Sequence, residues 1–481
     1  MTPAGRRTGG QAPGFQRRDA TLAGRRVAVV GGGLAGISAA LSCAEGGALV
    51  TLLERRRRLG GLTWSFEHNG MQVDNGQHVF LACCEAYIGL LGRLGSAVDV
   101  EWPRPLDIPV VAPAGRPGGP PLVGRLRRSG LPAPAHLAVS LLRYPHLSPL
   151  ERLRLGRALR GLATVDVDDP SSDRVTFAEW LRSKGQSQAA VAAVWDLITV
   201  PTVNLPASEA SLAAAATVFR TGLLARNDAA DMGWGRVPLG RLHGERASSA
   251  LARAGVVVRS GTRVEALRRS EGRWEVLTPG GPLGADAVVV AVPHDEAGRI
   301  VPPGAAPSQP EWDRLGFSAV VDVHLVFDRR VTPWQVMAGH RSAVQWVFDR
   351  SEAAGVEPPR QYLAVSYSAA DEMLGSRPED LVAATLGALG ELLPHVDAAR
   401  LVDSLVTKER RATFRASSGS AKLRPGPATA LPGLFLAGAW TDTGWPATME
   451  GAVRSGLAAA EALAASARAT PDFSSDTKEV A

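Results

Sequence analysis

The sequence predicts an α/β fold in which a nucleotide-binding domain is interleaved with a second domain of mixed sheet and helices. Three observations predict it. A β-branched run at 26–30 leads into a glycine turn and a helix-forming segment, a second apolar run at 48–53 ends in an acid, and a strand–glycine–helix pattern returns at 434–465. Strands that alternate with helices favour a parallel, Rossmann-like sheet. Because 481 residues exceed one minimal nucleotide-binding unit, we expect two intertwined domains.

The composition is ordinary for a globular protein with a sizeable core. Apolar residues make up 45% and charged residues 21% of the chain, and no uncharged apolar run reaches the roughly 20 residues of a membrane-spanning helix. The net charge of +6 comes largely from arginine, with clusters at 55–58 and 125–128 that lack interleaved aromatic residues. We therefore expect no nucleic-acid partner and interpret the clusters as solvated faces, with contact to anionic lipid headgroups as the second interpretation.

The cysteines and the chain ends favour a reducing compartment. Cys43, Cys83 and Cys84 show no metal-ligand spacing, and their odd number argues against a disulfide framework. We expect no metal and a cytoplasmic location, either free or peripheral at the inner face of the membrane. Residues 1–23 have no apolar stretch typical of a secretory signal, so we expect a disordered extension rather than a transit peptide, and a disordered tail at 467–481.

The segment 26–54 has the parts of a βαβ unit that binds a dinucleotide. Gly31 permits the tight turn, Gly33 lets a pyrophosphate approach the backbone, and Gly36 lets helix and strand pack closely. The helix N-terminus that follows offers free N–H groups and a positive dipole end to the phosphates. Glu54, at the end of the second strand, can accept hydrogen bonds from both ribose hydroxyls. The alternative is a glycine-rich turn in another α/β fold.

A second glycine turn and a polar knot follow. The pair Gly60-Gly61 suggests a second backbone approach to a long cofactor, which NAD would not need. Residues 66–74 predict a β-hairpin with Asn-Gly at its turn, and the polar segment 75–78 comes next. Residues 27–78 resemble the opening of the flavin amine oxidase and phytoene desaturase superfamily, in which a glycine pair follows the ribose acid.

One branch of that superfamily is the more specific resemblance. The Asp-Asn-Gly-Gln-His sequence at 74–78 is similar to the hydroxysqualene dehydroxylases, also described as squalene-associated FAD-dependent desaturases. The run Thr441–Ala452 resembles the same branch. Two residues depart from the superfamily pattern, since many members have Arg where this chain has Leu62 and Asp where it has Ala439. Trp440 or Asp442 would have to compensate for the second.

The resemblance implies FAD rather than NAD, held by an FAD-binding domain of the amine oxidase/phytoene desaturase type. The helix that begins near 450–452 could direct N–H groups and its dipole at the electron-rich edge of the isoalloxazine. The expected cofactor contacts are Gly31, Gly33, Leu34, Ala35, Gly36, Glu54, Arg55, Gly60, Gly61, Leu62, Thr63, Gly76, Gln77, His78, Val264, Gly438, Ala439, Met449, Glu450, Gly451 and Ala452.

The domain organisation follows from shifts in composition and periodicity. Helical apolar spacing and Pro-rich connectors beyond residue 81 predict a helical insertion, and β-type runs after residue 316 predict a sheet in the substrate domain. We therefore assign 24–81, 236–300 and 406–466 to the FAD-binding domain, and 82–235 and 301–405 to the substrate domain.

Two apolar stretches in the substrate domain have alternative interpretations. Residues 131–142, with arginines around them, are either an interfacial membrane-docking surface or a core helix. Residues 193–205, which include Trp195, are either ordinary core or the wall of a cavity for a bulky hydrocarbon, and the resemblance favours the wall.

The resemblance implies reductive removal of the allylic hydroxyl of hydroxysqualene to give squalene for hopanoid synthesis. Loss of hydroxide needs a proton, and the developing allylic cation needs a dry cavity with aromatic faces. His78 or Asp442 could donate the proton, solvent relay being the alternative. Asp74 is a third candidate, although an acid beside Asn-Gly is more often a turn residue. Glu450 more plausibly holds the ribityl chain or a helix N-terminus.

The aromatic candidates and the competing functions remain open at this point. Trp440 and Trp445 could shield the cation, or simply belong to an apolar wall. The reductant of the flavin is an unidentified electron donor. A carotenoid or phytoene-type desaturase and a non-catalytic escort that binds prenylated proteins are the alternatives. An amine oxidase is disfavoured because no aromatic cage with a catalytic lysine is evident.

Overall fold

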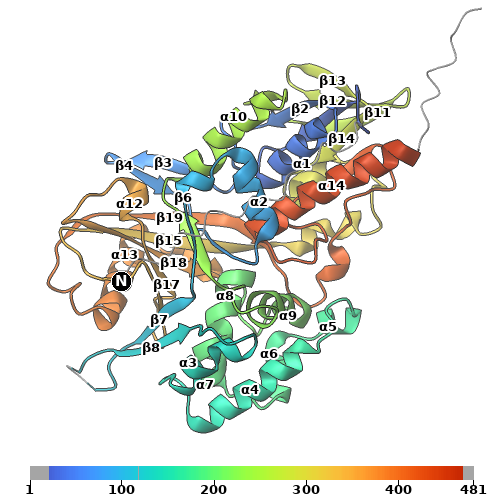
Figure 1. Ribbon diagram of the computed structural model, residues 1–481. Helices are drawn as coiled ribbons and strands as arrows, with labels where there is room; N and C mark the ends of the chain where they lie inside the picture. The colour runs from blue at the N-terminus through green and yellow to red at the C-terminus, as the bar shows by residue number, and fades with distance from the viewer. Residues whose placement is uncertain (1–20, 117–118, 470–481) are drawn as a thin grey trace, which may run out of the picture.

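Two sheets dominate the structure, one in each domain. The computed structural model describes residues 21–116 and 119–469. In Figure 1 a parallel sheet with its helices lies in the upper part, and a larger mixed sheet with a group of helices lies below it. The predicted α/β fold is confirmed.

The parallel sheet is assembled from three distant parts of the chain. Its strand order is β10-β2-β1-β14-β20, and each neighbouring pair is parallel. Side chains alternate across it, so that Val27 and Val29 face one core while Ala28 and Val30 face the other. The strands are β1 (Arg26–Val30), β2 (Leu49–Glu54), β10 (Val257–Ser260), β14 (Ala287–Val290) and β20 (Leu434–Leu436).

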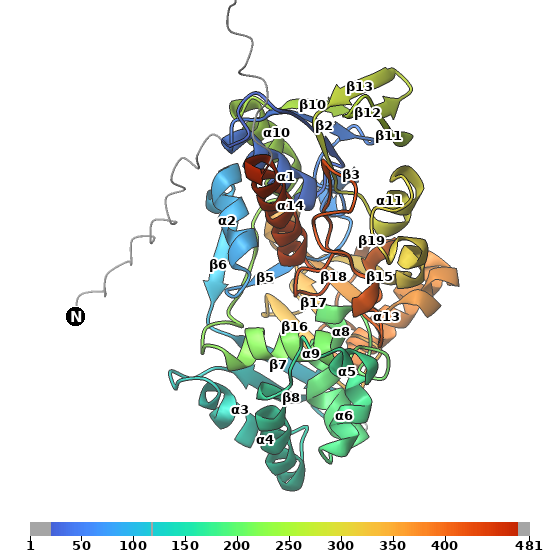
Figure 2. The ribbon, with the colours of Figure 1, turned by 90° about the vertical axis from the view of Figure 1, so that its right-hand side faces the viewer.

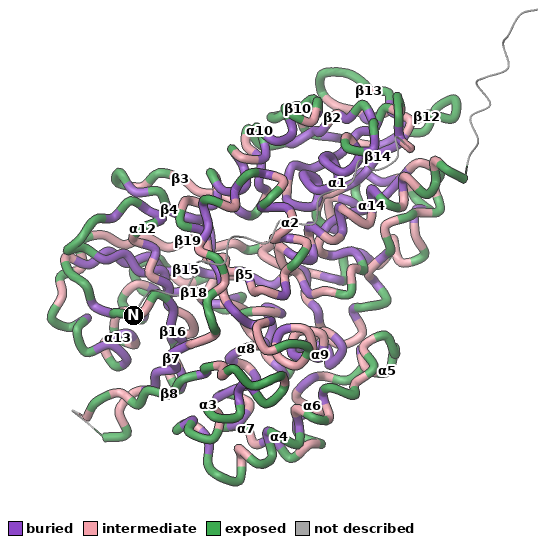
Figure 3. Tube along the Cα trace, viewed as in Figure 1, coloured by how far each residue is buried: buried purple, intermediate pink, exposed green. Residues whose placement is uncertain are grey.

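Each face of this sheet is covered, and Figure 3 shows its strands as largely buried. One face packs against α1 (Leu34–Glu45), α2 (Glu85–Leu94), α10 (Arg246–Arg253) and α14 (Met449–Ala469). Gly456 lets α14 lie directly on α1, because a Cβ there would clash with the Ala35 carbonyl. The other face carries β11 (Ala266–Ser270), β12 (Arg273–Thr278), β13 (Gly281–Ala285) and α11 (His294–Ile300).

The predicted hairpin forms beside this domain. β3 (Ser65–His68) and β4 (Met71–Asp74) are antiparallel, and Asn69 and Gly70 have φ of 48° and 78°. Two left-handed residues in succession give the turn whose twist suits a two-residue hairpin. A small sheet next to it joins β5 (Val79–Leu81), β9 (Met232–Gly235) and β6 (Val100–Arg104).

The mixed sheet has seven strands in the order β19-β15-β18-β17-β16-β7-β8. Its neighbouring strands are antiparallel except β16 and β7, which are parallel. The strands are β7 (Asp107–Ala112), β8 (Leu122–Arg127), β15 (Phe317–Phe327), β16 (Val336–Gly339), β17 (Trp346–Asp349), β18 (Gln361–Ser368) and β19 (Leu401–Phe414).

This sheet differs from the expected domain organisation in two respects. β7 and β8 come from 82–235, which is therefore not a purely helical insertion. β7 is buried from Ile108 to Ala112, so it lacks the alternation that would have revealed a strand. β19 pairs with β15 up to Phe414, so a boundary between residues 405 and 406 would cut through a strand.

The remaining substrate-domain elements are mostly short helices, several of which are seen at the bottom of Figure 2. The capping boxes Ser148–Glu151 and Thr176–Glu179 begin two of them. The helices are α3 (Ala138–Leu142), α4 (Pro149–Ala163), α5 (Pro170–Arg174), α6 (Phe177–Ser183), α7 (Gln188–Ala190), α8 (Asp196–Val203), α9 (Leu212–Phe219), α12 (Ser351–Ala354) and α13 (Pro378–Leu392). Single turns of 3₁₀-helix lie at Ala97–Asp99, Ala135–Leu137, Gln309–Leu315, Asp371–Gly375 and Ala421–Leu423, and π turns at Val191–Trp195, Arg220–Leu224 and Gly240–Glu245.

The chain ends differ slightly from expectation. Leu22 is buried and its N–H donates to the Gly46 carbonyl, so ordered structure begins within the expected extension 1–23. α14 runs to Ala469, past the expected start of the tail at 467. The rest of the expected N-terminal extension and of the expected tail lies outside the described residues. Within 21–116 and 119–469, none of the helices has the length and apolar character required to cross a bilayer.

Candidate functional site

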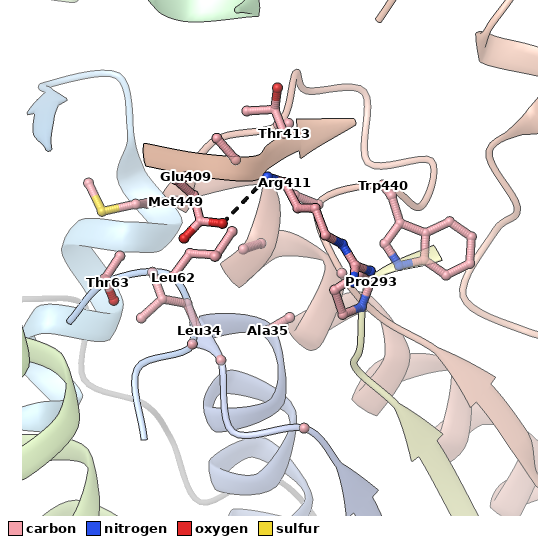
Figure 4. A pocket seen from close by; sticks show the side chains of 18 of the residues that line it. Leu34, Ala35, Leu62, Thr63, Pro293, Glu409, Arg411, Thr413, Trp440 and Met449 are labelled. Atoms are coloured by element: carbon pink, nitrogen blue, oxygen red, sulfur yellow. Dashed lines mark hydrogen bonds between the residues drawn. The ribbon is translucent and has the colours of Figure 1, made fainter. Parts of the chain in front are cut away.

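A cavity of about 490 Å³ lies where the two domains meet. Its walls come from the glycine turns of the parallel sheet, the segment 75–79, the mixed sheet and the start of α14. Figure 4 shows Leu34 and Ala35 on one side, and β19 with Arg411 on the other.

The first glycine turn has the shape that the sequence predicts. Gly31 has φ +108°, and a Cβ there would clash with the Ala291 carbonyl. A Cβ on Gly36 would clash with the Gly31 carbonyl, so neither position accepts a larger residue. Gly33 caps α1 in an extended conformation without a side-chain cap, which leaves the first N–H groups of a 12-residue helix available to an anion.

The second glycine turn lies directly on the first. Gly60 and Gly61 have φ of +97° and +58°, and a Cβ on Gly61 would lie 2.8 Å from the Gly33 Cα. The Gly60 N–H donates to the Gly32 carbonyl at 2.9 Å, which ties the turns together. Leu62 and Thr63 extend this wall of the cavity, and the Thr63 hydroxyl donates to the Gly60 carbonyl.

Glu54 lies at the edge of the cavity with its carboxylate already engaged. One oxygen accepts from the Gly32 N–H at 2.7 Å and the other from the Arg56 N–H at 2.8 Å. Carboxylate oxygens accept more than one hydrogen bond, so ribose hydroxyls can still be received. Arg55 and Val264 line the same end, and Arg55 pairs with Glu296 at 3.3 Å.

The C-terminal glycine turn closes the cavity opposite the first. Gly438 has φ +132°, and its N–H donates to the Ser455 hydroxyl at 2.8 Å. Ala439, Met449 and Ala452 line the cavity here. A Cβ on Gly451 would lie 2.7 Å from the Pro446 carbonyl, so Gly451 shapes the loop without being part of the wall.

Glu450 holds a helix N-terminus, one of the two roles that the sequence suggested, and it lies outside the cavity lining. Its carboxylate accepts from the N–H groups of Ala86 and Tyr87, at 3.2 and 2.7 Å, at the start of α2. It is 1% exposed and also pairs with Arg454 at 2.6 Å.

The three candidate proton donors fall in different environments. His78 lines the cavity together with Gly76 and Gln77, and burial lowers its pKa. Asp74 does not line the cavity, because it forms a buried ion pair with Arg350 at 3.0 Å. Asp442 is exposed and also lies outside the lining. Of the three, the structure brings His78 alone to the cavity.

The three candidate tryptophans also differ in whether they line the cavity. Trp440 lines the cavity, and its indole N–H donates to the Val292 carbonyl at 2.9 Å. Trp195 instead packs edge-on against Phe177 in the helical core of the substrate domain, 0% exposed and away from the lining. Trp445 lies beneath Arg454 at 5.0 Å and is not part of the lining either. The expected substrate contacts of Trp195 and Trp445 are therefore corrected to packing contacts.

Several lining residues were missed by sequence reasoning. Glu409, Arg411 and Thr413 alternate along β19 and face the cavity, as Figure 4 shows. Arg411 is ion-paired with Asp295 of α11, and its guanidinium lies 4.5 Å above the Phe317 ring. Residues 409–413 do not alternate between apolar and polar types, so strand periodicity offered no signal for them. The mixed sheet adds Val320, Trp346, Phe348, Ser366 and Ser368.

The site fits a long dinucleotide cofactor. The cradle consists of two glycine turns in contact, an uncapped helix N-terminus and an acid at the end of the next strand. A Cβ at these glycines would meet neighbouring backbone atoms. The third glycine turn and α14 extend it toward an apolar chamber. The fold and the site define an FAD-binding oxidoreductase.

Comparison with known proteins agrees with this assignment. The model of the family described as flavin containing amine oxidoreductase matches residues 34–464. A hydroxysqualene dehydroxylase from Rhodopseudomonas palustris is 30% identical, covering 92% of this chain and 100% of its own length. A 15-cis-phytoene desaturase from Synechococcus elongatus is 26% identical, covering 92% and 96%. A solved structure of putrescine oxidase bound to putrescine has a TM-score of 0.68 at 21% identity, covering 92% and 99%, and shares the fold.

The chain belongs to the flavin containing amine oxidoreductase family. It is an FAD-dependent oxidoreductase, and its relatives include proteins that act on hydrophobic isoprenoids.

Proposed function

We propose that this enzyme is a hydroxysqualene dehydroxylase, which reductively removes the allylic hydroxyl of hydroxysqualene to give squalene. The observation that carries the proposal is His78 lining a cavity whose nearby walls are apolar and aromatic. His78 belongs to the segment 74–78 that resembles the dehydroxylases, and three relatives at 25–30% identity bear that name. The phytoene desaturase at 26% supports the alternative of a desaturase.

The reaction requires a proton and a hydride. The C–O bond breaks with its electron pair on oxygen, the oxygen takes a proton and leaves as water, and a hydride forms the new C–H bond. When bound, reduced FAD supplies that hydride and becomes oxidised FAD. The cofactor would be held by the glycine turns, Glu54 and the start of α14.

The chain's own residues supply the remaining needs. Burial lowers the pKa of His78, so its protonated form is a stronger acid than an exposed imidazolium and gives up a proton more readily. Leu62 and Val79 contribute apolar side chains to the cavity wall. The ring faces of Trp346 and Phe348 can stabilise positive charge that develops on the allylic carbon.

The test uses the FAD-loaded enzyme under anaerobic conditions. The reduced enzyme is mixed with hydroxysqualene, and flavin reoxidation and squalene are measured together. We expect stoichiometric squalene and return of the oxidised flavin spectrum. If phytoene reduces the oxidised enzyme while hydroxysqualene leaves the reduced enzyme unchanged, the desaturase alternative replaces this proposal. Purified protein that binds no flavin would support the escort alternative.

A lipid-docking surface would give such an enzyme access to its substrate, and we propose one on α3 and α4. Five apolar side chains that are 45–75% exposed lie on these helices or in the loop before them: Leu131, Val139, Leu142, Leu150 and Leu153. Exposed arginines accompany them at 143, 154 and 157. Apolar side chains flanked by cations complement the acyl boundary and the anionic headgroups of a bilayer.

Vesicle sedimentation tests this surface. We expect the enzyme to co-sediment with vesicles containing phosphatidylglycerol and to be released by salt, since each basic residue near the surface contributes about 1 kcal/mol. The double variant L142Q/L153Q should lose most of this binding. Val98 and Val257, 76% and 55% exposed elsewhere, provide the matched control V98Q/V257Q. Equal loss of binding in both double variants would contradict the assignment.

A further inference from the structure

Asp322 is a buried acid that does not itself line the cavity. It lies in the middle of β15, is 1% exposed, and is surrounded by apolar residues in sequence. Its neighbours across the sheet are Ser366 on β18 and Thr407 on β19. Ser366 and Val320, which share its face of the sheet, line the cavity, so Asp322 lies just behind the cavity wall.

The segment that carries His78 covers this acid. A Cβ built on Gly76 would lie 3.6 Å from the Asp322 Oδ2 and 3.6 Å from the His78 Cε1, so the carboxyl and the imidazole approach the same point. Asn75 fixes the segment, because its side-chain oxygen accepts from the Trp64 N–H at 3.0 Å and its own N–H donates to the Trp64 carbonyl. A Cβ at position 76 would therefore contact both the acid and the histidine.

Two polar atoms of this cluster are unsatisfied. The Asp322 Oδ1 and the Gln77 Nε2 are buried and find no hydrogen-bond partner among the residues that the structure describes. A buried polar atom without a partner is costly, and such groups persist where they have a chemical role. The orphaned oxygen is therefore a second, independent indication of function.

The charge state of the cluster favours a transferable proton. Burial, together with the nearby Asp74 charge, raises the pKa of Asp322 to about 7, although hydrogen bonds from Ser366 and the Gln77 backbone oppose the rise. Burial lowers the pKa of His78. Below about pH 7 the Asp322 carboxyl therefore holds a proton, and the lowered pKa of His78 keeps the nearby imidazole neutral near pH 7.

The surrounding titratable groups do not supply this proton. Burial lowers the pKa of His324 to about 3 and raises that of Tyr362, so neither changes charge near neutral pH. The Asp74 and Arg350 charges compensate each other in their ion pair. The groups that face Asp322 are His324 on its own strand, Tyr362 on β18, Asp74 on β4, Arg350 before α12, His78, and Glu409 two register positions along β19.

We propose that Asp322 stores the proton for the leaving hydroxyl and that His78 transfers it into the cavity. The inference rests on the proposed dehydroxylase function. The His78 Nδ1–H donates to the Gly76 carbonyl at 3.3 Å, so the bare Nε2 is the nitrogen that takes the proton from Asp322 and gives it to the departing oxygen. The oxygen leaves as water, and the Asp322 carboxylate that remains balances the positive charge on the reacting carbon until the hydride that bound, reduced FAD would supply has reached it. Asp322 is a positioning residue, because it acts through His78.

The test follows single-turnover reoxidation of the dithionite-reduced holoenzyme by hydroxysqualene across pH 5.5–9. The wild-type rate should fall about tenfold per pH unit above roughly pH 7. D322N should be at least about 100-fold slower at pH 6, with a flat profile. H324Q, at a residue whose two ring nitrogens already bond Tyr362 and Thr407, should keep a profile of wild-type shape.

A second substrate separates proton delivery from structural damage. The acetate ester of hydroxysqualene loses a carboxylate, which needs no proton, so D322N should turn it over within about threefold of the wild-type rate. D322N that binds FAD and retains the wild-type rate and profile with hydroxysqualene overturns the inference. If D322N loses FAD, infrared titration of the wild-type enzyme decides, and absence of a carboxyl titrating near pH 7 overturns it. Failure of wild-type enzyme with hydroxysqualene contradicts the proposed function instead.

Discussion

The buried ion pair between Asp74 and Arg350 tests whether Asp74 is structural or catalytic. The two side chains are 5% and 7% exposed, and Asp74 also accepts from the Ser65 hydroxyl at 2.6 Å and the Leu239 N–H at 2.9 Å. D74N preserves the shape and leaves the Arg350 cation buried without its counter-charge. Breaking a buried pair in this way costs about 3–5 kcal/mol.

Thermal unfolding of the FAD-loaded protein measures the loss. With an unfolding entropy of about 2.1 cal/mol/K per residue, a chain of this length loses roughly 1 °C per kcal/mol, so the midpoint should fall by about 3–5 °C. The double variant D74N/R350M removes the orphaned charge and should recover most of the loss. Single-turnover rates of folded D74N should stay within about threefold of wild type.

Two results would refute this reasoning. If D74N is as stable as the wild-type protein, the pair does not hold β4 against the segment that precedes α12. If D74N is stable but about 100-fold slower, Asp74 takes part in the chemistry although it lies outside the cavity lining.

Three further predictions concern the cavity. G61A should weaken FAD binding about tenfold or more, because its Cβ would lie 2.8 Å from the Gly33 Cα, and flavin fluorescence measures this binding. The control variant is G255A, since Gly255 has a similar φ of +74° with open space around it, and it should bind FAD normally. H78Q should retain FAD and lose about 100-fold in turnover of hydroxysqualene, and a rate equal to wild type would remove His78 from the mechanism. The pKa of Asp322 is about 7 in the folded protein and 3.8 in its ordinary state, so the folded protein binds more protons than the unfolded chain between these two pH values. The free energy of unfolding of the wild-type protein should therefore fall as pH rises, by up to about 1.4 kcal/mol per pH unit. Chemical unfolding of D322N should lack this slope.

Local pattern predicted much of the cradle. The glycine turn, the Asn-Gly hairpin and the strands of the parallel sheet each depend on short-range requirements that a sequence displays, such as the positive φ of Gly31. The same holds for Glu54, whose position at the end of β2 follows from the strand–helix–strand pattern. The cofactor end of the site was therefore predictable.

The reacting end was less predictable because it depends on long-range pairing. Asp442 looked equivalent to His78 in sequence, and Asp74 was a third candidate; solvent exposure of Asp442 and the ion pair of Asp74 with Arg350 distinguish them from His78. Trp195 belongs to a core that forms between helices distant in the chain. Asp322 was visible in the sequence as a single acid in the apolar run of β15, but strand periodicity alone does not predict its role.

The role of β19 explains why cofactor and substrate regions form one cavity. This strand is the edge of the mixed sheet, yet Glu409 and Arg411 face the glycine turns of the other domain. Arg411 pairs with Asp295 on α11, which follows a strand of the parallel sheet, so the two domains are joined at the cavity itself. Packed walls contributed by both domains exclude water at the point of reaction, and a proton stored behind one wall in Asp322 then has a short route to the chamber through His78.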